Sequence, residues 1–220
     1  MKLISWNVNG IRAAAGKGLL SLMQEESPDI LCLQETKVHP DQLNDPKMIL
    51  PSYSSYWSSA SRPGYSGTAV FARNPPQHVK YGIGIRKFDS EGRFVITDQG
   101  NWVLYNIYFP NGSAREERHH FKQEFLVRLM RHLKWVQSQG REIIVVGDYN
   151  VAYRDEDVFD PVRLGSVSGF LPEEREWFKH FLTQGFTDVY TYIHPEEKHR
   201  YTWWSYRENA RRYNRGWRID

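Results

Sequence analysis

The chain has 220 residues, a formal net charge of +3, and a composition that is 40% hydrophobic and 25% charged. These values are typical of one folded soluble domain, which we place over residues 1–220. No apolar run approaches the ~20 residues of a membrane-spanning helix, and residues 1–25 contain no signal peptide. Because Cys32 is the single cysteine, no disulfide forms within the chain, and we expect a cytoplasmic protein.

Strands and amphipathic helices are predicted to alternate along the chain. In segment 114–139, the apolar residues Phe121, Phe125 and Leu129 have the spacing of a helix with one buried face. The four β-branched residues 143–146 predict a buried strand. The mixture indicates an α/β or α+β sandwich. The predicted strands are residues 2–6, 29–33, 68–72, 94–97, 101–108 and 142–146, and the predicted helices are residues 18–26, 114–139 and 172–184, with a long loop over 151–170.

The last part of the chain combines basic and aromatic side chains. Residues 198–220 contain seven Lys or Arg, two acids, three Trp and three Tyr. Basic residues interleaved with aromatic residues suit a nucleic-acid surface. A solvated basic helix beside a few core aromatic residues explains the same pattern equally well, so the composition alone leaves both interpretations open.

Polar side chains follow several of the predicted strands at the point where each strand ends. Asp148 comes just after the apolar run 143–146, and a carboxylate buried there needs a partner or a metal ion, because burying it alone costs several kcal/mol. If these strand ends converge, they form a pocket with two carboxylates, four amides and a phenol. The residues concerned are Asn7, Asn9, Glu35, Tyr108, Asn111, Asp148 and Asn150.

This set of side chains suits a hard cation that prefers oxygen ligands, because Mg²⁺ is commonly held by one or two carboxylates, waters and substrate phosphate oxygens. Each residue also has a purely structural explanation. The asparagines suit turns, Glu35 can pair with Lys37 or cap a helix, Tyr108 can be a sheet aromatic residue, and Asp148 can be a turn or N-cap residue.

Taken together, these segments resemble the exonuclease III family of abasic-site endonucleases, within the wider DNase I-like endonuclease/exonuclease/phosphatase superfamily. The resemblance covers the whole chain, in family order. The matching stretches are SWNVNGIRA (5–13), PDILCLQETK (28–37), GYSGTAVF (64–71), YNIYFPNG (105–112), VVGDYNVA (145–152), SGFLPEER (168–175) and TWWSYRENARRYNRGWRID (202–220). It implies a four-layer α/β sandwich, in which two packed, mixed and mostly antiparallel sheets are flanked by helices.

The resemblance also implies catalytic roles. Glu35 matches the principal metal ligand, with Asn7 beside it, and the implied cofactor is Mg²⁺ or alternatively Mn²⁺. Asp148 matches the acidic residue that activates the attacking water or assists the leaving group. Asn150 matches its partner and a phosphate binder, and Tyr108 matches the phenol that contacts the scissile phosphate.

Further residues are implied to contact DNA. Arg12, Tyr65 and Asn111 match positions near the DNA backbone, and Arg207 is expected to grip the backbone or probe the duplex beside the lesion. An aromatic and apolar pocket is implied to accept a flipped sugar that lacks its base, since extrusion is cheapest where stacking is already lost. The residues of this pocket are Trp203, Trp217 and Ile219.

The family pattern continues past the Asp of GWRID into a strand and a Ser-Asp-His segment, whereas this sequence ends at Asp220. In the family, the Asp at that position orients the histidine, which contacts the phosphate or water. None of the eight histidines in the chain occupies that motif. We therefore expect a chain that lacks the last strands of one sheet, either as a fragment or as a truncated protein, with impaired stability and activity.

The expected function of the complete protein is hydrolysis of DNA 5′ to abasic sites, with 3′–5′ exonuclease or 3′-phosphodiesterase activity as a companion. Its partner would be double-stranded DNA with abasic sites or damaged 3′ ends, bound by a monomer at the nucleoid and not at a membrane. Two alternatives remain. One is a phosphodiesterase of the same superfamily with another substrate, and the other is a damaged-DNA binder without catalysis.

Overall fold

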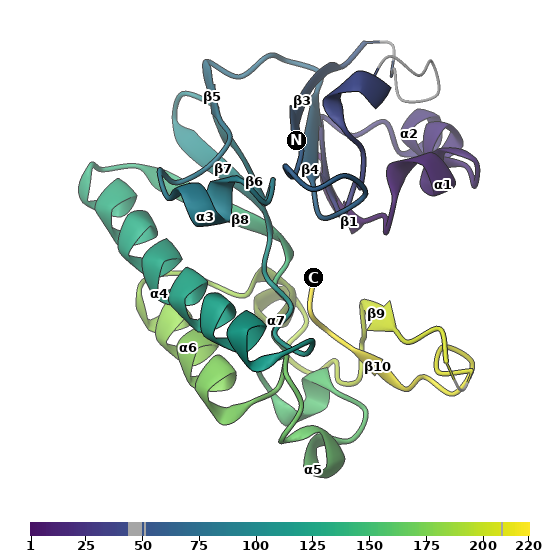
Figure 1. Ribbon diagram of the computed structural model, residues 1–220, viewed down its shortest axis with the longest axis vertical. Helices are drawn as coiled ribbons and strands as arrows, with labels where there is room; N and C mark the ends of the chain where they lie inside the picture. Colours follow the sequence, from purple (N-terminus) through teal and green to yellow (C-terminus); the bar gives the residue numbers. More distant parts are fainter. Residues whose placement is uncertain (44–49, 51, 208) are drawn as a thin grey trace. The chain divides into compact units, whose positions relative to one another are not determined.

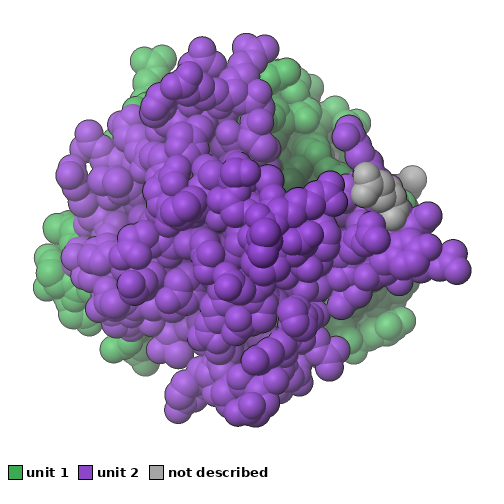
Figure 2. Space-filling model, turned by 90° about the horizontal axis from the view of Figure 1, so that it is seen from below, with its two compact units in different colours: residues 1–109, 135–148 green, residues 110–134, 149–220 purple. Residues whose placement is uncertain are grey.

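The computed structural model describes residues 1–43, 50, 52–207 and 209–220 (Figure 1). Internal contacts divide the chain into two compact units, which Figure 2 shows in green and purple. Unit 1 comprises residues 1–109 and 135–148, and unit 2 comprises residues 110–134 and 149–220.

Unit 1 contains two four-stranded sheets. The first sheet has the order β1-β2-β4-β3, in which only β1 and β2 are parallel. The second has the order β5-β6-β7-β8, in which only β7 and β8 are parallel. The strands are β1 (Leu3–Asn7), β2 (Ile30–Gln34), β3 (Ser54–Ser58), β4 (Thr68–Ala72), β5 (His78–Lys80), β6 (Phe94–Asp98), β7 (Trp102–Tyr108) and β8 (Glu142–Asp148).

The outer face of the first sheet packs against two short helices, α1 (Ile11–Ala15) and α2 (Leu19–Glu26). Successive side chains of a strand point to opposite faces, so alternate residues of β2 belong to different cores. Leu31 and Leu33 pack with the buried helix residues, which are Ile11, Ala14, Leu19 and Met23. The third helix of unit 1, α3 (Arg86–Asp89), immediately precedes β6.

The inner face of the first sheet packs against the second sheet. Ile30 and Cys32 of β2 belong to one cluster with Val95 of β6 and Leu104 of β7. Complete burial raises the pKa of the Cys32 thiol, so this residue acts as a small apolar side chain. The prediction of a sandwich of two mixed sheets flanked by helices is confirmed.

Asn106 ties the two sheets together with hydrogen bonds. It lies on β7 and is completely buried. Its Nδ2 donates to the carbonyl oxygens of Leu33 (3.1 Å) and Ala69 (2.8 Å), and its Oδ1 accepts a hydrogen bond of 2.7 Å from Nε2 of Gln34. Because a buried amide without partners destabilises the folded state, these bonds favour one alignment of the two sheets.

Unit 2 is mostly helical. Helix α4 (Glu116–Ser138) begins in this unit, and its residues from Trp135 onward belong to unit 1. Helix α6 (Pro172–Thr183) lies beside α4, where Nε1 of Trp177 donates to the carbonyl oxygen of Leu126 at 3.0 Å. The remaining elements are a 3₁₀ turn at Asp155–Asp157, α5 (Pro161–Leu164), α7 (Val189–Ile193), and the hairpin of β9 (Trp203–Trp204) and β10 (Gly216–Trp217).

Two sequence expectations about the elements are wrong in detail, and one of the two interpretations left open for the C-terminal residues is contradicted. Segment 151–170 is not a continuous loop, because it contains the 3₁₀ turn and α5, which are too short to show a periodic pattern. No helix occurs among the described residues of 198–220. The run 143–146 is not fully buried, since β8 is an edge strand of its sheet and Ile144 is 37% exposed.

Strand β8 runs through Gly147 and Asp148, so the carboxylate ends the strand instead of following it. Gly147 has a φ of +138°, and a Cβ added there would lie 1.9 Å from the carbonyl oxygen of Ile107 on the neighbouring strand. Only glycine allows this approach. Among the described residues, no helix is both long enough and apolar enough to cross a bilayer.

Candidate active site

Three polar side chains meet at the ends of strands β1, β2 and β8 in unit 1. Asn7 ends β1, Asp148 ends β8, and Glu35 directly follows β2. Nδ2 of Asn7 donates to Oε1 of Glu35 at 3.0 Å and to Oδ2 of Asp148 at 2.8 Å. Asp148 is only 4% exposed. One amide thus bridges two carboxylates that are far apart in sequence, as the converging strand ends require.

Glu35 is held in an unusual backbone conformation, with a φ of +51°. Strain of this kind is tolerated where the surrounding structure fixes the backbone, and here the carbonyl oxygen of Glu35 accepts a hydrogen bond of 2.7 Å from the N–H of Gly10. Its Oε2 lies 2.8 Å from Nζ of Lys37. The structural explanation of a Glu35–Lys37 pair is therefore correct, and it coexists with the bridge to Asn7.

The electrostatics of Glu35 favour its charged form. Burial alone raises the pKa of this carboxyl, but the hydrogen bond from Asn7 and the interaction with Lys37 outweigh burial, so the pKa is lowered. Glu35 is therefore ionised at neutral pH. An ionised carboxylate whose side chain is still 20% exposed has the charge and the access that a bound cation needs.

Tyr108, the last residue of β7, hydrogen-bonds to Glu35 through its side chain. Burial raises the pKa of its phenol, and the negative charges of Glu35 and Asp148 raise it further. The phenol is therefore protonated at neutral pH. It can donate a hydrogen bond to an anionic group but cannot act as a base.

Arg93 contacts two of the predicted tyrosines, although no pattern in the sequence points to it. Its side chain is 1% exposed. Nη1 donates to the carbonyl oxygen of Tyr108 and Nη2 to the hydroxyl oxygen of Tyr65, each at 2.9 Å, and Nε donates to Glu91 at 2.7 Å. The guanidinium carbon lies 4.9 Å from the ring centroid of Tyr108. A buried cation thus fixes both rings at once.

Arg12 lies on α1, where it is exposed beside a hollow of about 280 Å³. The exposed Asn9 accepts a hydrogen bond from the ammonium group of Lys37, which also lines the hollow. Two cations on one hollow attract phosphate groups. The lining residues are Gly10, Arg12, Ala13, Thr36, Lys37 and Gly64.

In unit 2, Asn150 is 8% exposed and adopts a φ of +51°. Its Oδ1 accepts a hydrogen bond of 3.2 Å from Nδ2 of Asn111, and its carbonyl oxygen accepts one of 2.8 Å from Nζ of Lys122. Asn111 also shapes a turn, because its Oδ1 accepts a hydrogen bond of 2.8 Å from the N–H of Ser113. The turn expected for Asn111 and its contact with another predicted site residue are both present.

Lys122 forms a completely buried ion pair with Glu174, at 2.5 Å. Glu174 also accepts hydrogen bonds from the backbone N–H groups of Gly169 (2.5 Å) and Leu171 (3.1 Å) at the start of α6. The pair therefore holds the backbone of Asn150 against the segment that precedes α6. The sequence predicted the start of this helix but gave no reason to pair Glu174 with Lys122, because 52 residues separate them.

The residues predicted to form the sugar pocket lie on the hairpin of β9 and β10 or, for Ile219, two residues after it. Trp203 pairs with Trp217 across the hairpin and is 41% exposed. Trp217 and Ile219 are each only 9% exposed. The rings of Trp217 and Phe170 pack in a T-shaped arrangement, with their centroids 6.4 Å apart and their planes at 83°. A ligand at this surface would therefore contact the exposed indole of Trp203 and the small exposed parts of Trp217 and Ile219.

The loop of this hairpin carries exposed basic residues, including Arg207. The guanidinium of Arg211 lies 5.4 Å from the ring of Trp204, which is the distance of a cation–π contact. Asp220 is also exposed, and its N–H donates to Oγ1 of Thr202 at 3.2 Å. Among the described residues of 198–220, the basic and aromatic side chains are carried by this hairpin, its loop and the residues that flank it, so the alternative of a basic helix is contradicted.

The residues that could hold a metal ion are few. Within the described residues, no three His, Cys, Asp or Glu side chains lie close enough together to hold one. The carboxylates of Glu35 and Asp148 remain as oxygen ligands, together with Oδ1 of Asn7, which also accepts a hydrogen bond of 3.0 Å from the N–H of Asn9. This donor set fits Mg²⁺, which binds through few carboxylates and keeps waters and substrate phosphate oxygens as its other ligands.

Comparison with known proteins identifies the group to which this arrangement belongs. The sequence matches the Endonuclease/Exonuclease/phosphatase family over residues 4–220. The chain belongs to this family. Among its relatives it is 41% identical to an exodeoxyribonuclease of Bacillus subtilis, over 100% of the chain and 86% of that protein. It is 38% identical to the DNA repair nuclease APEX1 of Danio rerio, over 100% of the chain and 71% of that protein.

Solved structures agree with this placement. An AP endonuclease from Archaeoglobus fulgidus superposes with a TM-score of 0.89 at 30% identity, over 100% of the chain and 84% of that structure. A 3′–5′ exonuclease from Neisseria meningitidis superposes with a TM-score of 0.91 at 28% identity, over 100% of the chain and 85% of that structure. The chain is therefore an enzyme of the exonuclease III group of abasic-site endonucleases, a hydrolase of the DNA repair nuclease class.

Proposed function

We propose that this nuclease hydrolyses the phosphodiester on the 5′ side of an abasic site in double-stranded DNA. Water attacks the phosphorus, the bond from phosphorus to the 3′ oxygen breaks, and the products are a 3′-hydroxyl and a 5′ sugar-phosphate. The observation that carries the proposal is the bridge from Asn7 to Glu35 and Asp148 with Tyr108 beside it. Trimming of 3′ ends, as an exonuclease or a 3′-phosphodiesterase, is the proposed companion activity.

We propose Mg²⁺ as the cofactor, with Mn²⁺ as the alternative. Glu35 would hold it, with Asn7 beside it, because these residues provide an ionised carboxylate and an amide oxygen in a half-exposed position. When bound, a divalent cation neutralises charge that develops on the phosphate oxygens.

The side chains of the chain supply the remaining chemistry. Asp148 would take the proton of the attacking water or assist the leaving 3′ oxygen, with its orientation fixed by Asn7. Tyr108 would donate a hydrogen bond to the scissile phosphate, because its raised pKa keeps the phenol protonated. Asn150, in unit 2, would bind a phosphate of the DNA through its amide.

Selectivity for abasic sites would arise in unit 2. A sugar without its base is small, so an aromatic pocket at Trp203, Trp217 and Ile219 can admit it and reject a complete nucleotide. Arg12, Tyr65, Asn111 and Arg207 would contact the DNA backbone. We propose a monomer that acts on chromosomal DNA in the cytoplasm, at the nucleoid.

The test is cleavage of a duplex oligonucleotide that carries one abasic analogue, with Mg²⁺ and then with EDTA, next to an undamaged duplex. We expect incision 5′ to the lesion that EDTA abolishes, with a 3′-hydroxyl on the upstream fragment. Lesion binding without incision would support a damaged-DNA binder instead. Hydrolysis of a phospholipid or an inositol phosphate in preference to DNA would support the other phosphodiesterase.

A further inference from the structure

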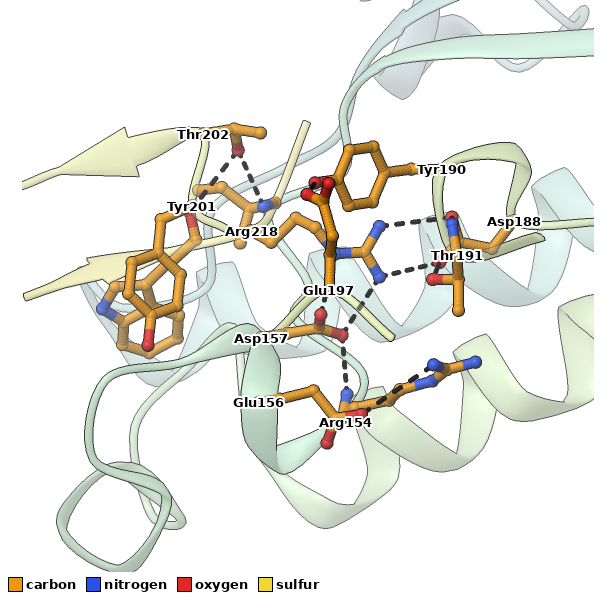
Figure 3. A network of polar contacts seen from close by, with 12 residues as sticks. Arg154, Glu156, Asp157, Asp188, Tyr190, Thr191, Glu197, Tyr201, Thr202 and Arg218 are labelled. Carbon is orange, nitrogen blue, oxygen red and sulfur yellow. Dashed lines mark hydrogen bonds and ion pairs between the residues drawn. The ribbon is translucent and has the colours of Figure 1, made fainter. Parts of the chain in front are cut away.

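Arg218 lies between Trp217 and Ile219 in the sequence. Its guanidinium makes two bidentate ion pairs, one with Asp157 and one with Asp188 (Figure 3). Nε and Nη2 donate to the two carboxylate oxygens of Asp157, at 2.7 and 3.2 Å. Nη2 and Nη1 donate to the two carboxylate oxygens of Asp188, at 2.7 and 3.2 Å. Bidentate guanidinium–carboxylate pairs fix both distance and orientation. One side chain therefore sets the relative position of three chain segments.

The two aspartates are themselves fixed by backbone groups. Oδ2 of Asp157 accepts a hydrogen bond of 2.8 Å from the N–H of Arg154, which closes the 3₁₀ turn. Asp188 is the N-cap of α7, where it accepts hydrogen bonds from the N–H of Thr191 at 3.3 Å and from its hydroxyl at 2.8 Å. Arg218 thus ties the end of β10 to a turn and to a helix start.

The backbone around Arg218 continues the same connection. The N–H of Arg218 donates to the carbonyl oxygen of Asp157 at 2.8 Å, and the N–H of Phe159 donates to the carbonyl oxygen of Gly216 at 3.1 Å. Because side chains alternate along an extended segment, Trp217 and Ile219 point away from the side of Arg218. They pack in one apolar cluster with Ala152, Val158, Leu164 and Phe170.

The charges make this arrangement depend on Arg218. The side chains of Arg218, Asp157 and Asp188 are 14%, 6% and 11% exposed. Burial alone lowers the pKa of Arg218, but the contacts with both aspartates outweigh burial and raise it, so the guanidinium stays charged. Without it, two poorly hydrated carboxylates would face each other, and such an uncompensated pair is unfavourable.

We propose that Arg218 is a positioning residue for lesion recognition, which holds Trp217 and Ile219 at the spacing that admits a sugar without its base. The inference rests on the proposed function. Arg218 itself touches no substrate in this scheme. It acts through the backbone of the two residues that flank it.

The test compares the binding of the 220-residue protein to a duplex with an abasic analogue and to the undamaged duplex. We expect Arg218→Met to lower the preference for the lesion about tenfold, the effect of one lost discriminating contact. The matched control is Arg141→Met, which removes an arginine with the same charge and the same bidentate geometry toward Asp98 in unit 1. This control should keep the full preference.

A second readout reports on Trp217 directly. It is the NMR resonance of the Trp217 indole N–H, which is assigned by its absence in Trp217→Phe. Arg218→Met should shift or broaden it, and Arg141→Met should not. If Arg218→Met does not fold, Arg218→Lys and Asp188→Asn are measured in the same way, since each removes only part of the ion pairing, and a smaller loss of preference is expected.

Full lesion preference together with an unchanged Trp217 resonance in a folded Arg218 variant would overturn the proposal. A lost resonance with full preference would also overturn it, because Trp217 would then not set selectivity. If the unmodified protein shows no preference for the lesion, the proposed function itself fails, and that result is distinct because it does not involve the variants.

Discussion

The two groups of candidate site residues are held in place in different ways. In unit 1, Asn7, Asp148 and Tyr108 end strands of five or seven residues that are paired along their length. In unit 2, Trp217 lies on a strand of two residues, and buried charges hold its surroundings. Sheet hydrogen bonds place the expected catalytic groups, whereas ion pairs place the expected recognition groups.

This difference between the two units implies that the stability of the protein responds differently to substitutions in each of them. A polar residue at a strand end of unit 1 can be replaced without loss of the fold, because the backbone of the sheet does not depend on that side chain. Replacing a charged residue that holds the loops of unit 2 lowers the free energy of unfolding, since removing one partner leaves a buried charge uncompensated. Four substitutions test this difference.

The largest effect is expected for Asp148→Asn. The asparagine keeps the shape and can still hydrogen-bond to Asn7, but it cannot accept the proton, so the rate of incision should fall about 10²- to 10⁴-fold. The measurement is single-turnover cleavage of the abasic duplex with enzyme in excess. Unfolding by urea should be almost unchanged, and a large loss of stability would show that Asp148 also supports the fold.

The next effect is expected for Lys122→Met, which removes one partner of the completely buried pair with Glu174. The free energy of unfolding should fall by about 3–5 kcal/mol, the usual cost of leaving one buried charge unpaired. Urea denaturation measures it. The double variant Lys122→Met, Glu174→Met should recover part of this loss, and a double variant no more stable than Lys122→Met would mean that the charge is not the cause.

A smaller effect is expected for Arg93→Met, which removes hydrogen bonds to Tyr65 and to the backbone of Tyr108. With both rings less well fixed, incision should slow roughly tenfold to a hundredfold, as for a displaced catalytic group. Because Arg93 is buried in unit 1, stability should also fall, by about 1–3 kcal/mol. Rates are compared at temperatures where both proteins are fully folded. An unchanged rate would remove Arg93 from the site.

The smallest effect is expected for Asp188→Asn, which should lower the free energy of unfolding by about 1–2 kcal/mol at neutral pH. Burial raises the pKa of Asp188, but its contacts with Arg218 and Thr191 outweigh burial, so the folded-state pKa lies below the unfolded value. Such a group stabilises the fold above its unfolded pKa of about 3.9 and loses this contribution as the pH falls through the folded value. The difference in stability between the two proteins should therefore be constant above about pH 5 and shrink below about pH 4.

A stability difference that grows toward acid would contradict this assignment, since it would mean that the carboxyl is protonated more easily in the folded state. The matched control is Asp155→Asn, an exposed aspartate paired with Arg175 at the surface. Surface pairs contribute little. Asp155→Asn should change the free energy of unfolding by no more than a few tenths of a kcal/mol at every pH, as most substitutions of exposed residues do.

The strand ends of unit 1 could be predicted from the sequence because short-range patterns specify them. An apolar run predicts the strand, and Glu35 and Asp148 each follow the last residue of such a run by two positions. The positions that the sequence did not identify are buried charges whose partners lie far away. Lys122 and Glu174 are 52 residues apart, and Arg218 and Asp157 are 61 residues apart. No local pattern encodes such a pair.

The same reasoning explains the errors in the elements. Strands β9 and β10 have two residues each, and α5 and α7 have four and five, so none is long enough to show a period. The exposure of Ile144 depends on the place of β8 at an edge of its sheet, which is a property of topology and not of the run itself. Composition described the C-terminal residues correctly as basic and aromatic, but it did not distinguish a hairpin from a helix.

Gly147 has a consequence for how this gene tolerates mutation. A Cβ at this position would lie 1.9 Å from a backbone oxygen of β7, and backbone cannot move aside as a side chain can. Every amino acid reachable from a glycine codon by one base change carries a Cβ. In a saturation library selected for repair of abasic DNA, codon 147 should therefore be depleted of every missense allele, alanine included, although no reacting atom belongs to it.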